Sequence, residues 1–280
     1  MKAYAGVAVL AFALMGAVSV SALAQGVIID HTCTDISKIP QAAITKAKAT
    51  FRVAYGHTSY GSQIISGMDA LSKADAELFA FTNGPTSGDG KVLSLLNCPM
   101  PGDLGGAWAY ETRNFLNGSG KGVNLIMWSW RDQVGFSSEA DIETYLSQMS
   151  DLEKEFPGVK FIYMTGCLDG TGANGNLNKR NEQIRAFCRK NGKALFDFAD
   201  IESYDPDGKV NYMNLGATGS CDYKDGAATR NWADEWTQKN PGKIALPDNA
   251  ARSRPLNGAL KGRAFWWMMA RLAGWNPQSA

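Results

Sequence analysis

The stretch Phe51-Arg-Val-Ala-Tyr-Gly-His-Thr-Ser-Tyr-Gly-Ser-Gln63 decides the fold class of this chain. Its first half is β-branched and aromatic, as is typical of a buried strand, and the run breaks at Gly56. Apolar residues then recur at helical spacing. The stretch therefore predicts a strand, a polar turn that contains Ser59, and a helix.

Strands and helices alternate along the rest of the chain. The clearest helix covers residues 138–156, where Ser138 can cap the start and Pro157-Gly158 ends the pattern. Further helices are predicted directly after Ser59, at 177–191 and at 260–273. Four short apolar runs are predicted as buried strands: 51–55, 123–128, 159–164 and 194–198. This alternation predicts an α/β fold, a three-layer αβα arrangement around a mostly parallel sheet.

Residues 25–280 are predicted to form a single domain, because no stretch reads as a convincing linker. Two segments lack periodicity and are predicted as long loops, 82–106 and 204–257. Long loops in a compact domain are usually functional or disordered. We expect both to frame a site at the carboxyl edge of the sheet, where open α/β sheets bind ligands.

Residues 1–24 have a basic start, an apolar run and Ala22-Leu-Ala24, which predicts a cleaved signal peptide and a periplasmic or secreted protein. No later run is long enough to predict a membrane span. The 28 basic residues include Lys2, so the remainder carries as many basic as acidic side chains, which argues against a nucleic acid partner. Five cysteines, an odd number, leave at least one without an intrachain disulfide.

Ser59 is the leading candidate nucleophile. A serine between a strand and a helix projects its hydroxyl into a crevice, while the helix N-terminus offers N–H groups to a developing oxyanion. His57 precedes it by two residues and is a possible base. Two alternatives remain open: Ser59 or Thr58 caps the helix, and His57 holds the turn by a hydrogen bond.

Three segments together resemble the SGNH/GDSL hydrolase superfamily: Gly56-His-Thr-Ser-Tyr-Gly61, the strand that ends at Trp128, and Thr165-Gly-Cys-Leu-Asp-Gly170. The resemblance implies that Ser59 is the nucleophile and that a glycine N–H and an amide side chain form the oxyanion hole. Gly106 and Gln133 are the available counterparts. The late Asp-x-x-His block of the family has no match, because Asp248-Asn-Ala-Ala251 places alanine where histidine is expected.

Substrate-binding residues are predicted at two places. Asp169 follows a predicted strand, and Asn176 and Arg180 lie shortly after it, a polar cluster that suits a hydroxyl-rich ligand but is also ordinary loop chemistry. Arg252 and Arg254 could neutralise an acidic substrate, or could be merely solvated. Asp205 and Asp207 weakly resemble a calcium loop, and no metal or other cofactor is predicted.

These observations predict an exported SGNH-like hydrolase that acts on a carbohydrate or other polar ester through a serine nucleophile. Its partner would be a small-molecule or polysaccharide substrate. Because a standard triad cannot be assembled, two alternatives stay open. One is a lyase that acts on an acidic polysaccharide, and the other is a non-catalytic carbohydrate-binding protein on a degenerate hydrolase scaffold.

Overall fold

The structure, a computed structural model, describes residues 26–99, 104, 106–130 and 132–277. The predicted signal peptide lies outside the described residues. None of the described helices combines the length and the apolar character that crossing a membrane requires.

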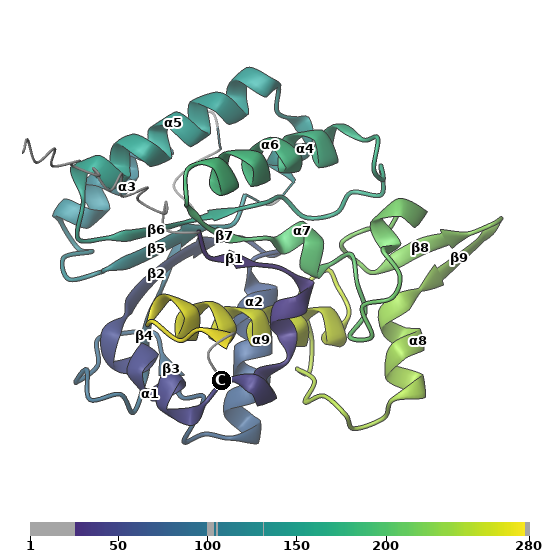
Figure 1. The fold of residues 1–280 in the computed structure, drawn as a ribbon, viewed down its shortest axis with the longest axis horizontal. Helices are drawn as coiled ribbons and strands as arrows, with labels where there is room; N and C mark the ends of the chain where they lie inside the picture. The colour runs from purple at the N-terminus through teal and green to yellow at the C-terminus, as the bar shows by residue number, and fades with distance from the viewer. Residues whose placement is uncertain (1–25, 100–103, 105, 131, 278–280) are drawn as a thin grey trace, which may run out of the picture.

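A seven-stranded sheet with the order β1-β7-β6-β5-β2-β4-β3 forms the centre of the molecule (Figure 1). Every pairing in it is parallel. The strands are β1 (Ile28–Ile29), β2 (Arg52–His57), β3 (Phe81–Thr82), β4 (Leu93–Pro99), β5 (Leu125–Trp128), β6 (Lys160–Met164) and β7 (Ala194–Phe196). All four predicted strands are therefore confirmed.

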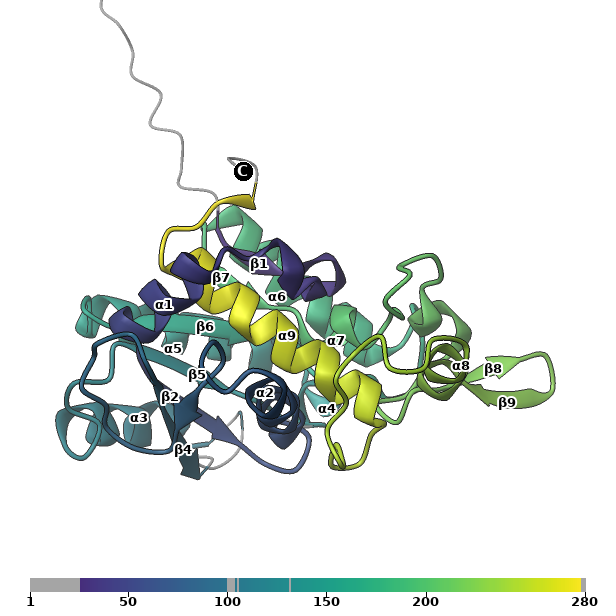
Figure 2. The same cartoon turned by 90° about the horizontal axis from the view of Figure 1, so that it is seen from below.

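Helices cover both faces of the sheet (Figures 1 and 2). One face carries α3 (Trp108–Asn117), α4 (Gln133–Phe136), α5 (Glu139–Glu155) and α6 (Asn176–Lys190). The other face carries α1 (Gln41–Thr50), α2 (Ser62–Ala74) and α9 (Pro255–Leu272). Two separate apolar cores fill the spaces between the layers. The predicted three-layer αβα fold is confirmed.

Local sequence signals account for the helix ends. Ser138 and Asp141 form a capping box at the start of α5. The chain leaves α6 through Gly192, whose φ of 62° is in the left-handed region that favours glycine. Helix α9 begins five residues before the predicted 260, with Pro255 in its first turn, where a missing N–H costs nothing.

The two predicted long loops contain regular structure, so those predictions were wrong. Strand β4 lies within residues 82–106 and pairs with β2 along its length. Residues 204–257 include a projecting antiparallel hairpin of β8 (Asp222–Asp225) and β9 (Ala228–Asn231), followed by α8 (Trp232–Lys239) (Figure 1). The hairpin residues are mostly polar and exposed. They therefore lack the alternation of apolar and polar residues by which a strand is recognised in a sequence.

The order of strands reverses its direction of progression beside β2. Strand β2 pairs with β4 on one side and with β5 on the other. The chain passes from β2 to β3 and β4 on one side and then crosses to β5 on the other, so the carboxyl ends of β2 and β5 form the switch point at which open α/β sheets bind ligands. The turn that carries Ser59 begins here.

Candidate active site

Ser59 lies in the turn between β2 and α2, and its side chain is partly buried. Two hydrogen bonds hold the turn: the Ser62 N–H donates to the Thr58 carbonyl at 3.1 Å, and the Ser62 hydroxyl donates to the Ser59 carbonyl at 2.6 Å. Gly61 is the N-cap of α2, and no side chain caps it. The capping alternative for Ser59 and Thr58 is therefore wrong, and the Ser59 hydroxyl has no partner among the described residues.

His57 ends β2 with its ring partly buried against Tyr55, the ring centroids 4.6 Å apart. Its Nδ1 lies 3.0 Å from the Thr58 carbonyl, which can only accept, so Nδ1 carries the proton. Nε2 is buried and has no partner among the described residues. Burial lowers the pKa of His57, against smaller opposing effects of the Thr58 carbonyl and the Asn97 side chain. The ring is thus neutral, with a free lone pair on Nε2.

Backbone N–H groups are available beside Ser59. The N–H groups of Ser59 and of Tyr60 donate to no atom of the described residues. Gly106 lies in an exposed turn after the loop that contains Leu104. Gln133 Oε1 accepts the Leu104 N–H at 2.6 Å, so this side chain ties the loop to the start of α4. The predicted oxyanion roles of Gly106 and Gln133 stay predictions.

Gly61 brings the turn close to the ends of β2 and β5. A Cβ at Gly61 would lie 2.4 Å from His57 Cβ and 2.9 Å from Ser129 Cβ. Ser129, which directly follows β5, is therefore part of the same region, and Asn97 joins it from β4. Sequence reasoning missed both. Ser129 follows a predicted strand and could have been found, whereas Asn97 lay in a segment predicted as loop.

Asp169 and Asn176 lie at the neighbouring edge, around the short helix α4. Asp169 Oδ1 accepts from the N–H and hydroxyl of Thr171, at 2.9 and 2.6 Å. Its Oδ2 faces Gly135, where a Cβ would lie 3.2 Å away. The Asn176 amide donates to the carbonyls of Gly135 and Ser137, each at 2.9 Å. Asn176 thus holds backbone in place, while Asp169 Oδ2 accepts no hydrogen bond from the described residues.

Phe136 stands between these two pinned carbonyls, and its side chain is 86% exposed. Ser137 also binds back to the carbonyl of Gln133 at 2.9 Å, so the whole turn of α4 is fixed. The backbone that carries this exposed ring is therefore fixed before a ligand covers it, so binding has little ordering of the loop to offset. Sequence reasoning did not single out Phe136.

The three candidate arginines have different surroundings. Arg180 donates to Gln183 at 3.1 Å and lies 3.8 Å from Glu139 on the outer helical layer. Arg254 pairs with Asp234 at 2.9 Å. Arg252 is exposed and has no partner among the described residues. Only Arg252 thus offers a free guanidinium within this set.

A buried ion pair lies beneath the site. Lys261 of α9 and Glu202, which follows α7 (Phe198–Ile201), are both fully buried, and their Nζ and Oε1 atoms are 2.5 Å apart. Lys261 also donates to Gln63 in the first turn of α2. Glu202 Oε2 accepts the Leu168 N–H at 2.8 Å, in the loop after β6. The pair therefore joins α9 to two segments that border the Ser59 turn.

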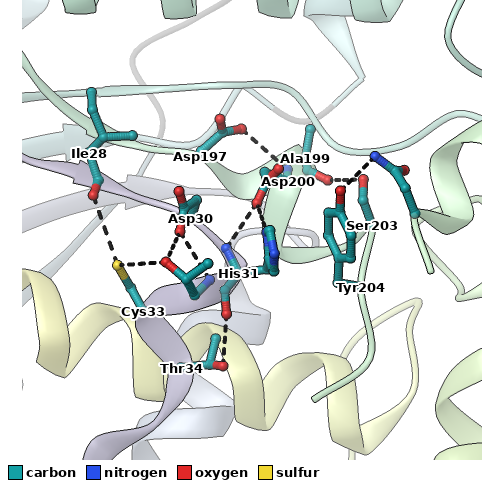
Figure 3. A network of polar contacts seen from close by, with 12 residues as sticks. Ile28, Asp30, His31, Cys33, Thr34, Asp197, Ala199, Asp200, Ser203 and Tyr204 are labelled. Atoms are coloured by element: carbon teal, nitrogen blue, oxygen red, sulfur yellow. Dashed lines mark hydrogen bonds and ion pairs between the residues drawn. The ribbon is translucent and has the colours of Figure 1, made fainter. Parts of the chain in front are cut away.

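Asp30, His31 and Asp200 form a cluster that could in principle hold a metal ion (Figure 3). Asp200 Oδ1, however, accepts from both the backbone N–H and Nδ1 of His31, at 2.9 and 2.5 Å. Asp30 Oδ1 accepts from the N–H and the hydroxyl of Thr32. These bonds engage one oxygen of each carboxylate, and the direct contact of His31 with Asp200 is that of an ion pair.

The weak calcium motif is also bound internally. Asp205 Oδ1 accepts from the N–H groups of Asp207 and Gly208, and its Oδ2 accepts the Tyr212 hydroxyl at 3.0 Å. Asp207 Oδ1 accepts the Trp236 indole N–H at 2.9 Å. Both carboxylates hold the turn that precedes the hairpin. All five cysteines lie among the described residues, and none of them forms a disulfide.

No protein-family model matches the chain, and no curated protein matches its sequence. Similar solved structures include an acetyl xylan esterase, with 9% identity, 76% of this chain and 97% of that chain covered, and a TM-score of 0.41. An acetylxylan esterase from Geobacillus stearothermophilus has 11% identity, 83% and 98% coverage, and a TM-score of 0.40. At such low identity, the roles of individual residues rest on the geometry described above.

Proposed function

We propose that this chain is a serine hydrolase of the SGNH type that cleaves a carbohydrate or similar polar ester, with Ser59 as nucleophile and His57 as base. One observation carries the proposal: an unbonded serine hydroxyl stands at the switch point of the sheet, two residues from a neutral imidazole with a free Nε2. Nucleophile, base and free N–H donors on one turn are the parts that acyl transfer needs.

The reaction would proceed in two halves. Ser59 Oγ attacks the acyl carbon while His57 Nε2 takes its proton, and the N–H groups of Ser59 and Tyr60 stabilise the oxyanion. The proton then passes to the departing alcohol oxygen, which leaves an acyl-enzyme. Water, deprotonated by the same Nε2, attacks the acyl carbon, releases the acid and returns the proton to Ser59.

The orientation of His57 differs from that in a standard triad. The Thr58 carbonyl accepts the Nδ1 proton at 3.0 Å, the position that a carboxylate holds in a Ser-His-Asp site. A carbonyl fixes the tautomer but stabilises the imidazolium less than a carboxylate does. Ser59 and His57 share no hydrogen bond among the described residues, and bound substrate would have to bring them together.

Two groups near α4, the exposed ring of Phe136 and the Oδ2 atom of Asp169, support a carbohydrate as the substrate. The exposed Phe136 can stack on the C–H face of a sugar ring, and Asp169 Oδ2 can accept from its hydroxyls. Since residues 1–24 read as a signal peptide, we place the enzyme outside the cytoplasm, where polymeric glycans occur.

The deciding experiment measures acid release by the mature protein from a small acyl ester and from acetylated polysaccharides. Ser59→Ala should abolish release and His57→Ala should reduce it at least about a hundredfold, the lower end of the range for a general base. Ser66→Ala is the matched control, because its hydroxyl donates to the Ser62 carbonyl at 3.1 Å, within α2 and away from the Ser59 carbonyl. Full release by Ser59→Ala would overturn the proposal. An unsaturated, ultraviolet-absorbing product would indicate a lyase, and binding without turnover a binding protein.

A further inference from the structure

Two described residues other than glycine have a positive φ, Cys221 at 72° and Arg252 at 59°. Left-handed backbone is unfavourable for residues with a Cβ, and it persists where surrounding structure over-determines it. The two strained residues belong to separate segments that meet, since Cys221 Sγ lies 3.6 Å from Ser253 Oγ. The backbone strain of Cys221 and Arg252 therefore lies in two turns that contact each other.

Three hydrogen bonds fix the turn of Arg252. The Ser253 N–H donates to the Ala250 carbonyl at 2.7 Å and closes the turn. The Ser253 hydroxyl donates to the Gly219 carbonyl at 2.6 Å, and the Gln63 amide donates to the Ala251 carbonyl at 2.9 Å. The backbone is therefore fixed directly before and directly after Arg252.

The two residues that bind this turn, Gln63 and Gly219, both lie near the candidate nucleophile. Gln63 lies in the first turn of α2, four residues after Ser59. Gly219 packs on the residue that follows Ser59, since a Cβ there would lie 3.4 Å from Tyr60 Cε1. The Arg252 turn thus borders the Ser59 turn, and α2 and α9 pack side by side behind it (Figure 2).

Two other basic side chains near the Arg252 turn are paired with carboxylates. Arg254 pairs with Asp234, and Lys73 pairs with Asp248 at 2.7 Å. Arg252, exposed and unpaired among the described residues, keeps its charge available. A guanidinium presents its donors as a planar fork that matches a carboxylate.

We propose that Arg252 forms an anion subsite of the active site and that the substrate is an ester of a uronic acid-containing polysaccharide. The guanidinium binds the carboxylate of a uronate residue adjoining the sugar whose ester is cleaved. This inference rests on the proposed function for the ester, whereas the binding of uronate by Arg252 can be measured without any turnover.

The test is calorimetric binding of unesterified oligogalacturonate and of neutral xylo-oligosaccharide of equal length to the mature protein. Oligogalacturonate should bind more tightly than the neutral xylo-oligosaccharide. Its affinity should fall as the salt concentration rises. Arg252→Gly should reduce its affinity about 10- to 100-fold, the effect of losing hydrogen bonds to a charged group. Glycine relieves the positive φ, so this variant should fold at least as stably, and a purely structural role for Arg252 predicts no loss of affinity.

Arg254→Ala is the matched control and should change the affinity less than twofold, since its guanidinium is already paired. Equal affinity for the two oligosaccharides, no binding of either, or unchanged affinity in Arg252→Gly would overturn the subsite. Absence of ester cleavage with Arg252-dependent uronate binding would instead overturn the proposed hydrolase and leave the subsite standing.

Discussion

The hydroxyl of Tyr55 donates a hydrogen bond to the carbonyl of Gly61 at 3.0 Å, across the turn that carries Ser59. Tyr55 is fully buried within β2, and burial raises the pKa of its hydroxyl, so the donor keeps its proton. The bond holds the start of α2 against the end of β2. The shape of the turn is thus set by a strand residue and by a glycine that permits close approach.

Gly61→Ala should inactivate the protein and destabilise it by about 1–3 kcal/mol, the usual cost of overpacking. The added Cβ would lie 2.4 Å from His57 Cβ and 2.6 Å from the Tyr55 hydroxyl, so the turn must move. Urea unfolding and ester turnover measure the two effects. Gly158→Ala is the control, because a Cβ there contacts nothing within 4 Å. Full activity in Gly61→Ala would show that the turn has room to shift.

The pH dependence of kcat/KM should report His57. A general base must be unprotonated, and burial lowers the pKa of this ring below 6.5. The midpoint of the fall in rate should therefore lie below pH 6.5. Asn97→Ala removes a group that raises this pKa, so its profile should fall at still lower pH. An inflection above 6.5 in the unmodified protein would contradict the role of His57 as the buried base.

Phe136→Ala should raise KM for acetylated polysaccharide about tenfold and leave turnover of a small acyl ester unchanged. The ring is 86% exposed, so its removal opens no cavity and should not alter stability. An aromatic stacking contact contributes about 0.5–1.5 kcal/mol beyond its buried area, which is of the order of a tenfold change. Tyr110→Ala is the control, an aromatic residue 65% exposed on α3. Equal effects of both variants would assign no particular role to Phe136.

The sequence was sufficient for the fold because its strands are continuous apolar runs. Residues 125–128 and 161–164 are buried on both faces, so burial leaves a direct signature. Strand β4 escaped notice because polar residues interrupt it at Ser94 and Asn97. These side chains find their surroundings only in the folded chain, where the Ser94 hydroxyl donates to the Gly84 carbonyl and Asn97 lies beside His57.

The residues of the candidate site likewise differ in how far the sequence could predict them. Ser59 and His57 could be found because strand, turn and helix are adjacent in sequence. That Arg252 borders them depends on contacts from Gln63 and Gly219, which lie far away along the chain. The different surroundings of Arg252 and Arg254 could not be predicted either, because Asp234 reaches Arg254 only through the packing of α8 beside α9.

Lys261→Met should destabilise the protein by about 3–5 kcal/mol, because it leaves the Glu202 carboxylate buried without its counterion. Adding Glu202→Gln removes that charge and keeps an oxygen for the Leu168 N–H, so the double variant should recover part of the loss. Denaturant unfolding of both single variants and the double variant gives the coupling energy. A double variant as unstable as the sum of the two single changes would contradict the pairing.

The ion pair of His31 and Asp200 should make stability depend on pH. Burial lowers the pKa of His31, but the hydrogen bond and charge of Asp200, with Asp30 and Asp197 nearby, outweigh it and raise the pKa overall. The same contact lowers the pKa of Asp200 despite its burial. The histidine contribution is therefore complete below pH 6.5 and lost as pH rises through the raised pKa. The aspartate contribution is complete above pH 3.8 and lost as pH falls through the lowered pKa.

His31→Phe keeps a ring stacked on Tyr204, which lies 3.7 Å away, and removes only the charged partner. It should cost about 1.5 kcal/mol between roughly pH 4 and 6.5, the low end for a hydrogen bond to a charged group, because both side chains are about one quarter exposed. The cost should shrink at pH 9. Lys38→Gln, which breaks an exposed pair with Asp35, should change stability little at either pH. A cost of His31→Phe that is the same at pH 5.5 and pH 9 would mean that the pair is not charged in the folded protein.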